Sequence, residues 1–220
     1  MNSNNHITVD QIKNDAEVIK KEQVEWRHYL HAHPELSFKE ERTTHYIVNK
    51  LKNFGYTDIQ IGFGPLKTGV MVEIGSGRPC VMLRADIDAL PIQEQTGVEF
   101  CSQSKGVSHA CGHDAHITNL LGVAKLLKKY EKSIKGRVKL LFQPAEETRV
   151  KIYEKPLSGA GYVVRSGAID DVDAIFGMHV WGMFSKGKIY VKSGVILYKH
   201  RNNINCQLQK YDQENKDIHS

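Results

Sequence analysis

The sequence lacks several features that would place it in a special class of protein. It has no apolar run near the roughly 18 residues that a membrane span needs, and its first 21 residues carry no apolar segment of a signal peptide. Aromatic residues make up 8% of the chain, with 18 Gly and 6 Pro, which excludes disordered, collagen-like and low-complexity classes. We therefore expect a cytoplasmic protein that does not bind a membrane.

Cysteine and net charge are also modest. None of the four cysteines has CxxC spacing, so we expect no disulfide framework, and we expect Cys80 and Cys101 to be packing residues. The formal net charge is +5, and the basic residues are scattered along the chain, which argues against a nucleic-acid partner. Histidine is the abundant type, with 11 residues, of which three fall within 109–116.

Hydrophobic periodicity predicts helices that alternate with strands. Helices are expected at 8–31, 38–54, 113–129 and 158–166, and strands at 69–75, 80–85, 138–142, 174–178 and 187–191. Ser37 and Glu40 form a capping-box pattern before the second helix, and Gly55 is a plausible stop. The alternation predicts an α/β fold with a largely parallel central sheet. Residues 197–220 show no clear period, so we expect a domain of 1–196 and a poorly structured tail.

Polar side chains follow three of the predicted strands where each strand ends. They are Asp86 and Asp88 after 80–85, Glu146 and Glu147 after 138–142, and His179 after 174–178. If these strands are parallel neighbours, their carboxyl ends meet at one edge of the sheet, where open α/β sheets bind ligands. The helix that opens at His113 brings Cys111 to the same edge. The sequence thus predicts one crevice that gathers sulfur, nitrogen and oxygen donors.

This set of donors is typical of a transition-metal site. Cys111 and His113 are separated by one glycine, so both can face one ion; Zn, Mn, Co and Ni use such donors, and a thiolate favours Zn. Adjacent residues of a strand point opposite ways. At the strand end, therefore, one carboxylate of Glu146–Glu147 can hold metal while the other stays free as a general base. The pattern predicts a metallohydrolase.

Each group also has a structural interpretation when it is considered alone. The alternatives are a cap or turn for Asp86 and Asp88, solvated surface for Glu146 and Glu147, a core histidine for His179, a buried thiol for Cys111, loop polarity for His109 and His116, and structural roles for His28, His31 and His33. Their placement on one predicted edge favours the metal site over these alternatives.

Five segments resemble, in order, the motifs of the M20 metallopeptidase family. They are Arg27–Glu35, Leu83–Ile92, His109–His116, Phe142–Glu147 and Ile175–Trp181. The chain is most similar to the subgroup of amidohydrolases that cleave N-acyl amino acids, which includes hippurate hydrolases and indole-acetyl-amino-acid hydrolases. The resemblance implies a zinc-peptidase-like metal domain that carries an inserted lid domain, and it implies hydrolysis of the amide bond of a small N-acyl amino acid.

The same resemblance implies a role for each site residue. Cys111, His113, Glu147 and His179 look like metal ligands, and Glu146 looks like the general base. Asp86 and Asp88 look like groups that orient the ligands without binding the metal themselves. The implied cofactors are divalent Mn, Zn or Co ions, two in a complete site.

The chain also departs from the family. Family members are nearly twice as long; their lid begins near residue 196, and its Gly-Gly-His motif is absent here, so dimerisation through the lid would not be possible. A further metal-ligating histidine is missing, and neither His200 nor His219 matches it. The chain therefore looks truncated, and a non-catalytic remnant of such an enzyme is the alternative. A structural zinc module fits poorly, because structural sites usually close at short spacing.

Overall fold

The computed structural model describes residues 7–152, 155–185 and 187–191. The chain divides into two compact units, the first ending at Val180 and the second beginning at Trp181. The tail expected at 197–220, and its boundary at 196, lie outside the described residues. All the helices and strands described below belong to the first unit.

The helices lie close to their predicted positions. They are α1 (Val9–Ala32), α2 (Glu41–Phe54), α3 (His113–Lys129) and α4 (Gly159–Arg165), with a short 3-10 helix at Glu131–Ser133. Thr8 caps α1 through a capping box with Gln11. Gly55 ends α2 in the left-handed conformation, as expected. No helix among the described residues is long and apolar enough to cross a lipid bilayer.

The α/β class is confirmed, with a mixed five-stranded sheet. The strands are β1 (Ile59–Phe63), β2 (Leu66–Ser76), β3 (Cys80–Asp86), β4 (Gly136–Gln143) and β5 (Ala174–Gly177), in the spatial order β1-β2-β4-β3-β5. β4, β3 and β5 are parallel neighbours, whereas β1, β2 and β4 pair antiparallel. Asp86 pairs with Gln143 and Arg84 with Gly177. The three parallel strands therefore end at the same edge.

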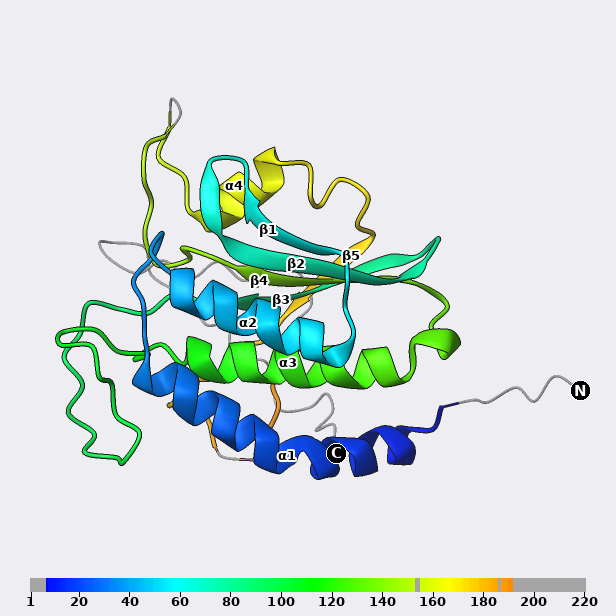
Figure 1. The fold of residues 1–220 in the computed structure, drawn as a ribbon, viewed down its shortest axis with the longest axis horizontal. Coiled ribbons are helices and arrows are strands. Elements are labelled where there is room, and N and C mark those ends of the chain that lie inside the picture. The colour runs from blue at the N-terminus through cyan, green and yellow to red at the C-terminus, as the bar shows by residue number, and fades with distance from the viewer. Residues whose placement is uncertain (1–6, 153–154, 186, 192–220) are drawn as a thin grey trace, which may run out of the picture. The chain divides into compact units, whose positions relative to one another are not determined.

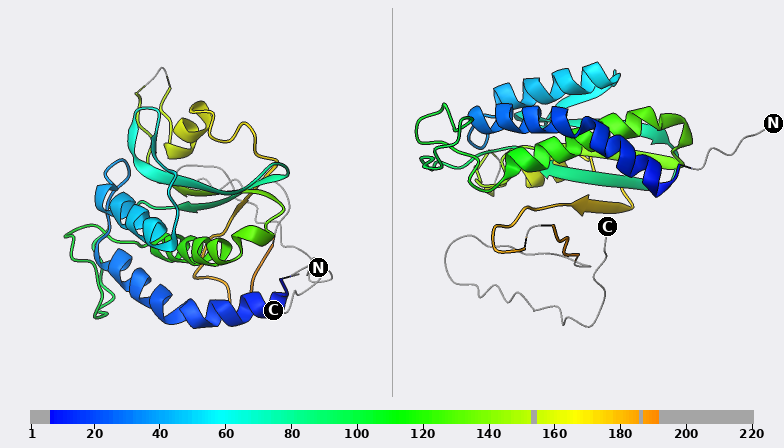
Figure 2. Two further views of the ribbon diagram at one scale, coloured as in Figure 1. Left: turned by 45° about the vertical axis from the view of Figure 1, so that its right-hand side comes forward. Right: turned by 90° about the horizontal axis from the view of Figure 1, so that it is seen from below.

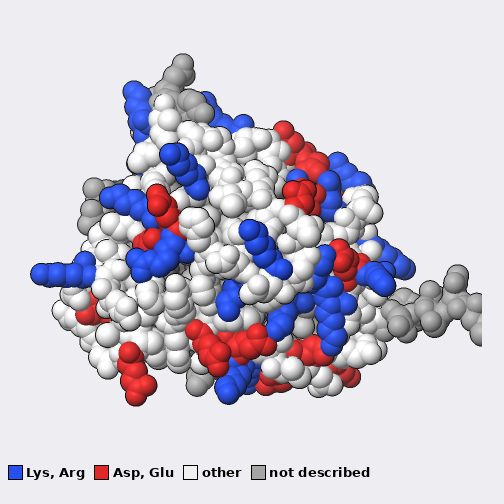
Figure 3. Space-filling view, viewed as in Figure 1, with Lys and Arg blue, Asp and Glu red and all other residues white. Residues whose placement is uncertain are grey.

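Helices cover both faces of the sheet, as continuous apolar strands require. On one face α2 and α3 pack against alternate strand residues such as Val70, Val72 and Leu140, and α1 packs against α3. On the other face α4 contributes Val163 to a smaller cluster with Met82. Figure 1 shows the three long helices on one side of the sheet and α4 on the other, and Figure 2 shows the same layers from two further directions. Acidic and basic side chains are interspersed on the face seen in Figure 1 (Figure 3).

Three expectations need correction. Ser37 does not cap α2: its hydroxyl donates to Asp88, and Glu35 accepts the amides of Arg42 and Thr43 instead. Residues 187–191 form no strand where they are described. Cys101, expected to be a packing residue, is exposed, whereas Cys80 is buried.

The strand β1 was not predicted from the sequence. It is short, and much of it is exposed, so it carries little of the apolar pattern by which strands are recognised.

Candidate metal centre

A tight turn places Cys111 and His113 side by side at the start of α3. Gly112 between them is left-handed, with φ of 90°, and a Cβ added to it would lie 2.3 Å from Cγ2 of Val180. Only glycine tolerates both conditions without strain. The sequence Cys-Gly-His thus lets the segment that follows β5 pass directly over the turn.

His113 presents one ring nitrogen to the crevice. Its side chain is 1% exposed, and Nδ1 lies 2.8 Å from the carbonyl oxygen of Asp88. Because a carbonyl can only accept, Nδ1 carries a proton, and Nε2 is the ring nitrogen that a cation can reach. Within the described part of the chain Nε2 is buried without a hydrogen-bond partner, and the nearest carboxylate oxygens are those of Asp86 at 3.6 Å and Glu147 at 3.8 Å. Burial opposes the charged ring, but the hydrogen bond to Asp88 and the negative charges of Asp86 and Asp88 outweigh burial and raise the pKa of His113 to about 11. A metal ion bound at Nε2 would replace that second proton.

The two aspartates after β3 hold other parts of the centre. Oδ2 of Asp88 accepts from the hydroxyl of Ser37 at 2.6 Å and from the backbone amide of Glu147 at 3.0 Å. Asp86 accepts from Arg84 at 2.7 Å and binds Nδ1 of His116 at 2.6 Å. Burial opposes ionisation of both aspartates, but these hydrogen bonds outweigh it and keep each pKa below its usual range.

The end of β4 delivers two adjacent carboxylates. Ala145 adopts φ of 50°, and the chain then turns so that Glu146 is exposed while Glu147 is half-buried. Partial desolvation and the negative charges of Glu147 and Asp86 raise the pKa of Glu146. An ionised carboxylate whose pKa is raised toward neutrality is well suited to accept a proton.

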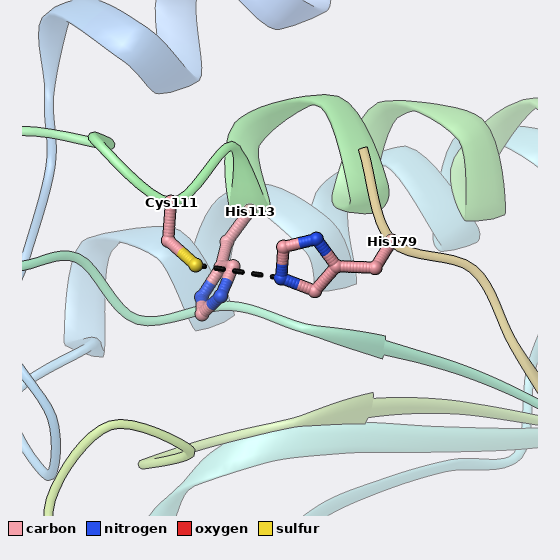
Figure 4. Close-up of side chains that lie close together, drawn as sticks. All are labelled: Cys111, His113 and His179. Carbon is pink, nitrogen blue, oxygen red and sulfur yellow. Dashed lines mark hydrogen bonds between the residues drawn. The ribbon is translucent and has the colours of Figure 1, made fainter. Parts of the chain in front are cut away.

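His179 meets Cys111 from the segment that follows β5. Its Nε2 lies 3.4 Å from Sγ of Cys111, and Figure 4 shows Cys111, His113 and His179 converging from three directions. Partial burial and the neighbouring histidines lower the pKa of His179. A lowered pKa favours the neutral ring, which is the form that ligates metals.

These residues fit a metal ion by geometry and by charge. Three groups each have donor atoms within 4.8 Å of one another: Cys111, His113 and His179; Asp86, His113 and His116; and His113, Glu146 and Glu147. His113 belongs to all three groups, and its free Nε2 faces the others. The carboxylates of Asp86, Asp88, Glu146 and Glu147 surround it, and Arg84, which contacts Asp86, is the nearby arginine. Such surroundings favour a cation.

The structure brings together every residue that the sequence assigned to the site, and it gives the remaining histidines separate surroundings. His31 lies 2.8 Å from Asp114 and 3.0 Å from Glu94 in an ion-pair network, and His28 stacks on Phe100. His109 is buried, and neither of its ring nitrogens has a hydrogen-bond partner within the described part of the chain. The structural interpretation of His28 and His31 agrees with these contacts.

Two residues near the centre were missed or left open by the sequence. His116 lies one helical turn beyond His113, so the i, i+3 spacing could have indicated that both share one face of α3. Its Nε2 accepts a 2.9 Å hydrogen bond from the amide of Val180. Glu40 is fully buried behind the Glu146–Glu147 turn, and no local pattern indicated this placement.

Comparisons with known proteins agree with this architecture. The model of peptidase family M20/M25/M40 matches residues 82–216, which is more than half of the chain. The chain is 40% identical over 193 residues to an N-acyl-L-amino acid amidohydrolase of Geobacillus stearothermophilus, covering 87% of this chain and 50% of that protein. It is 44% identical to an N-acetyl-L-cysteine deacetylase of Bacillus subtilis, covering 81% and 41%.

A solved structure shares both the fold and a substantial part of the amino-acid sequence. A dinuclear metal-binding peptidase of the M20 family from Bacillus subtilis superposes with a TM-score of 0.72 at 42% identity, covering 81% of this chain and 47% of that one. The α/β domain with donors at the carboxyl edge of its sheet shares the fold of a metal-binding peptidase. The chain belongs to peptidase family M20/M25/M40. It spans about half the length of the curated relatives it matches.

Proposed function

We propose that this chain carries the metal centre of a hydrolase that cleaves the amide bond of N-acyl amino acids. The observation that carries the proposal is the buried Nε2 of His113, which has no hydrogen-bond partner among the described residues and lies in one group of donors with Cys111 and His179 and in another with Glu147. The printed activities of the related amidohydrolase and deacetylase support the substrate class.

The residues divide into ligands and supporting groups. Cys111, His113, Glu147 and His179 would hold divalent Mn, Zn or Co ions, two in a complete site. The related dinuclear peptidase supports the count of two. Ions bound there would supply Lewis acidity, polarising the carbonyl of the substrate and lowering the pKa of a water molecule.

Glu146 would act as the general base. It is exposed at the strand end, next to the half-buried Glu147, and no hydrogen bond within the described part of the chain uses its carboxylate. It would accept the proton of the attacking water and return it to the nitrogen of the leaving amine. The amide C–N bond then breaks, and the products are a carboxylic acid and a free amino acid.

Asp88 and Asp86 would orient the ligands. Asp88 fixes the tautomer of His113 through its backbone carbonyl and holds the amide of Glu147 with its side chain. Asp86 fixes the ring of His116, which in turn holds the backbone beside His179. Partners of this kind keep ligands in the geometry that the metal requires.

The test is to purify the 220-residue chain, measure bound metal by elemental analysis, and assay amino acid release from N-acetyl and N-benzoyl amino acids. Metal-dependent release that is lost with a chelator and restored by Mn or Zn would support the proposal. A folded chain that binds metal without turnover would leave the metal centre standing and remove the hydrolytic activity. A folded chain that binds no metal would contradict both.

A further inference from the structure

Glu40 is a buried carboxylate that the proposed chemistry does not use. It precedes α2, and its relative exposure is 0%. One carboxylate oxygen accepts the hydroxyl of Thr68 at 2.8 Å, and the other accepts the backbone amide of Ala145 at 2.7 Å. Among the described residues no lysine or arginine pairs with it, and the charged group that acts on it is Asp88, which has the same sign.

A carboxylate in this position is costly to keep. Burial raises the pKa of Glu40 to about 7, although the hydrogen bonds from Thr68 and Ala145 oppose the shift. An apolar residue or an amide would avoid the cost of burying a charge. The burial of Glu40 therefore indicates that its carboxylate has a specific use.

The contact with Ala145 is the informative one. Ala145 adopts φ of 50°, a left-handed conformation that is unfavourable for an alanine. It directly precedes Glu146 and Glu147, so its conformation sets the direction in which both carboxylates leave β4. The hydrogen bond from its amide to Glu40 compensates for the unfavourable conformation.

The rest of the turn is held as firmly. The carbonyl of Ala145 accepts from the amide of Gly159 at 2.8 Å, and the amide of Glu147 donates to Asp88 at 3.0 Å. A Cβ on Gly69 would lie 2.5 Å from the Pro144 ring, and one on Gly159 would lie 1.7 Å from the Pro144 carbonyl oxygen. Two buried carboxylates thus hold alternate amides of a turn that is packed on both sides.

We propose that Glu40 is a positioning residue that acts through the backbone amide of Ala145 to fix the placement of Glu146 and Glu147. This inference rests on the proposed function, because Glu147 is one of the proposed ligands. Glu40 touches neither substrate nor metal, and its effect passes through one hydrogen bond to the main chain.

Three substitutions separate positioning from general stability. Glu40→Leu removes both acceptors at similar volume. Glu40→Gln keeps an oxygen that accepts from Ala145 and supplies an N–H₂ group that can donate to Thr68, so it is the conservative rescue. Thr68→Val removes the other partner of Glu40 and leaves the Ala145 contact in place, so it is the matched control.

Metal affinity is the first measurement, by titration of Zn²⁺ into the metal-free 220-residue chain. Glu40→Leu should weaken binding about 10- to 100-fold, as loss of an outer-shell partner does. Glu40→Gln and Thr68→Val should stay within about twofold of wild type. Because Glu40 acts through the turn, Glu40→Leu combined with Glu147→Gln should bind no more weakly than Glu147→Gln alone.

Wild-type affinity in folded Glu40→Leu, or losses that add fully in the double variant, would overturn the inference while the proposed function stands.

The Ala145 amide proton gives a second measurement, by NMR, that needs neither metal nor the leucine variant. It should shift and exchange faster in Glu40→Gln than in Thr68→Val, because a neutral acceptor replaces a charged one. An equal response in the two variants would also overturn the inference. If wild type binds no metal, the proposed function fails and this amide signal alone decides the role of Glu40.

Discussion

The backbone amide of Val180 donates a 2.9 Å hydrogen bond to Nε2 of His116, and Nδ1 of the same ring lies 2.6 Å from Asp86. Because an amide N–H only donates, Nε2 accepts and Nδ1 carries the proton. One buried ring therefore ties the end of β3 to the residue that follows His179. His116 sets the path of the segment that delivers a proposed ligand.

Replacing His116 by leucine should weaken metal binding about 10- to 100-fold, because the backbone beside His179 loses its anchor. It should also lower stability, because Oδ1 of Asp86 and the Val180 amide lose their partner. Zn²⁺ titration and thermal melting measure the two effects. The matched control is His45→Leu on the exposed face of α2, where Nδ1 of the ring lies 2.7 Å from the carbonyl oxygen of Glu41 in the same helix.

Nitrogen NMR of the His116 ring in the metal-free protein provides an independent check, with the proton expected on Nδ1. A proton on Nε2, or unchanged affinity in folded His116→Leu, would contradict this role.

Gly112→Ala should destabilise the protein more than Gly77→Ala does. Both glycines are left-handed, with φ of 90° and 82°, but a Cβ at Gly77 meets nothing within 4 Å. Each substitution carries the left-handed penalty of about 1–2 kcal/mol. Gly112→Ala adds the clash with Val180, for which overpacking costs of about 1–3 kcal/mol are typical. Urea denaturation measures the difference, and equal losses in the two variants would show that Val180 does not lie against the turn.

Glu40→Gln should stabilise the protein at pH 8 and have little effect near pH 4. Burial raises the pKa of Glu40 from its ordinary value of 4.5 to about 7 in the folded protein, so folding disfavours its charged form. The resulting penalty is absent below the unfolded pKa and grows as pH rises toward the folded pKa. It reaches about 3 kcal/mol at most.

Chemical denaturation of the wild type and of Glu40→Gln from pH 4 to pH 8 measures the difference in their free energies of unfolding. Thr68→Val is the control for loss of the hydrogen bond between Thr68 and Glu40. A stabilisation that does not change with pH would show that burial does not disfavour the charged form of Glu40. Asp88, the charged neighbour of Glu40, keeps a lowered pKa.

The sequence predicted the elements that carry strong local patterns. β3, β4 and α3 were placed within a few residues because their apolar runs and helical stripe are unambiguous. The site residues were predicted to share one edge of the sheet because each follows the end of a strand and neighbouring parallel strands end at the same edge. β1 was missed because much of it is exposed. A strand was predicted at 187–191 because the apolar residues there have the pattern of a strand, but the structure forms none at these residues.

Contacts between distant residues account for what the sequence did not indicate. The partner of Ala145 is Glu40, 105 residues away, and the partner of Val180 is His116, 64 residues away. Ser37 fits a capping pattern, but its hydroxyl donates a hydrogen bond to Asp88 instead. Local patterns carry no information about such competition, so the supporting residues of the site became visible only in the folded chain.

Glu146→Gln and Glu147→Gln, measured as a pair, separate the roles of the two adjacent carboxylates. We expect Glu146→Gln to abolish release of amino acid from N-acyl substrates while metal content stays near that of wild type. Glu147→Gln should bind metal more weakly and also lose turnover, because its carboxylate is a proposed ligand. Undiminished turnover in Glu146→Gln, or unchanged metal binding in Glu147→Gln, would contradict this division of roles.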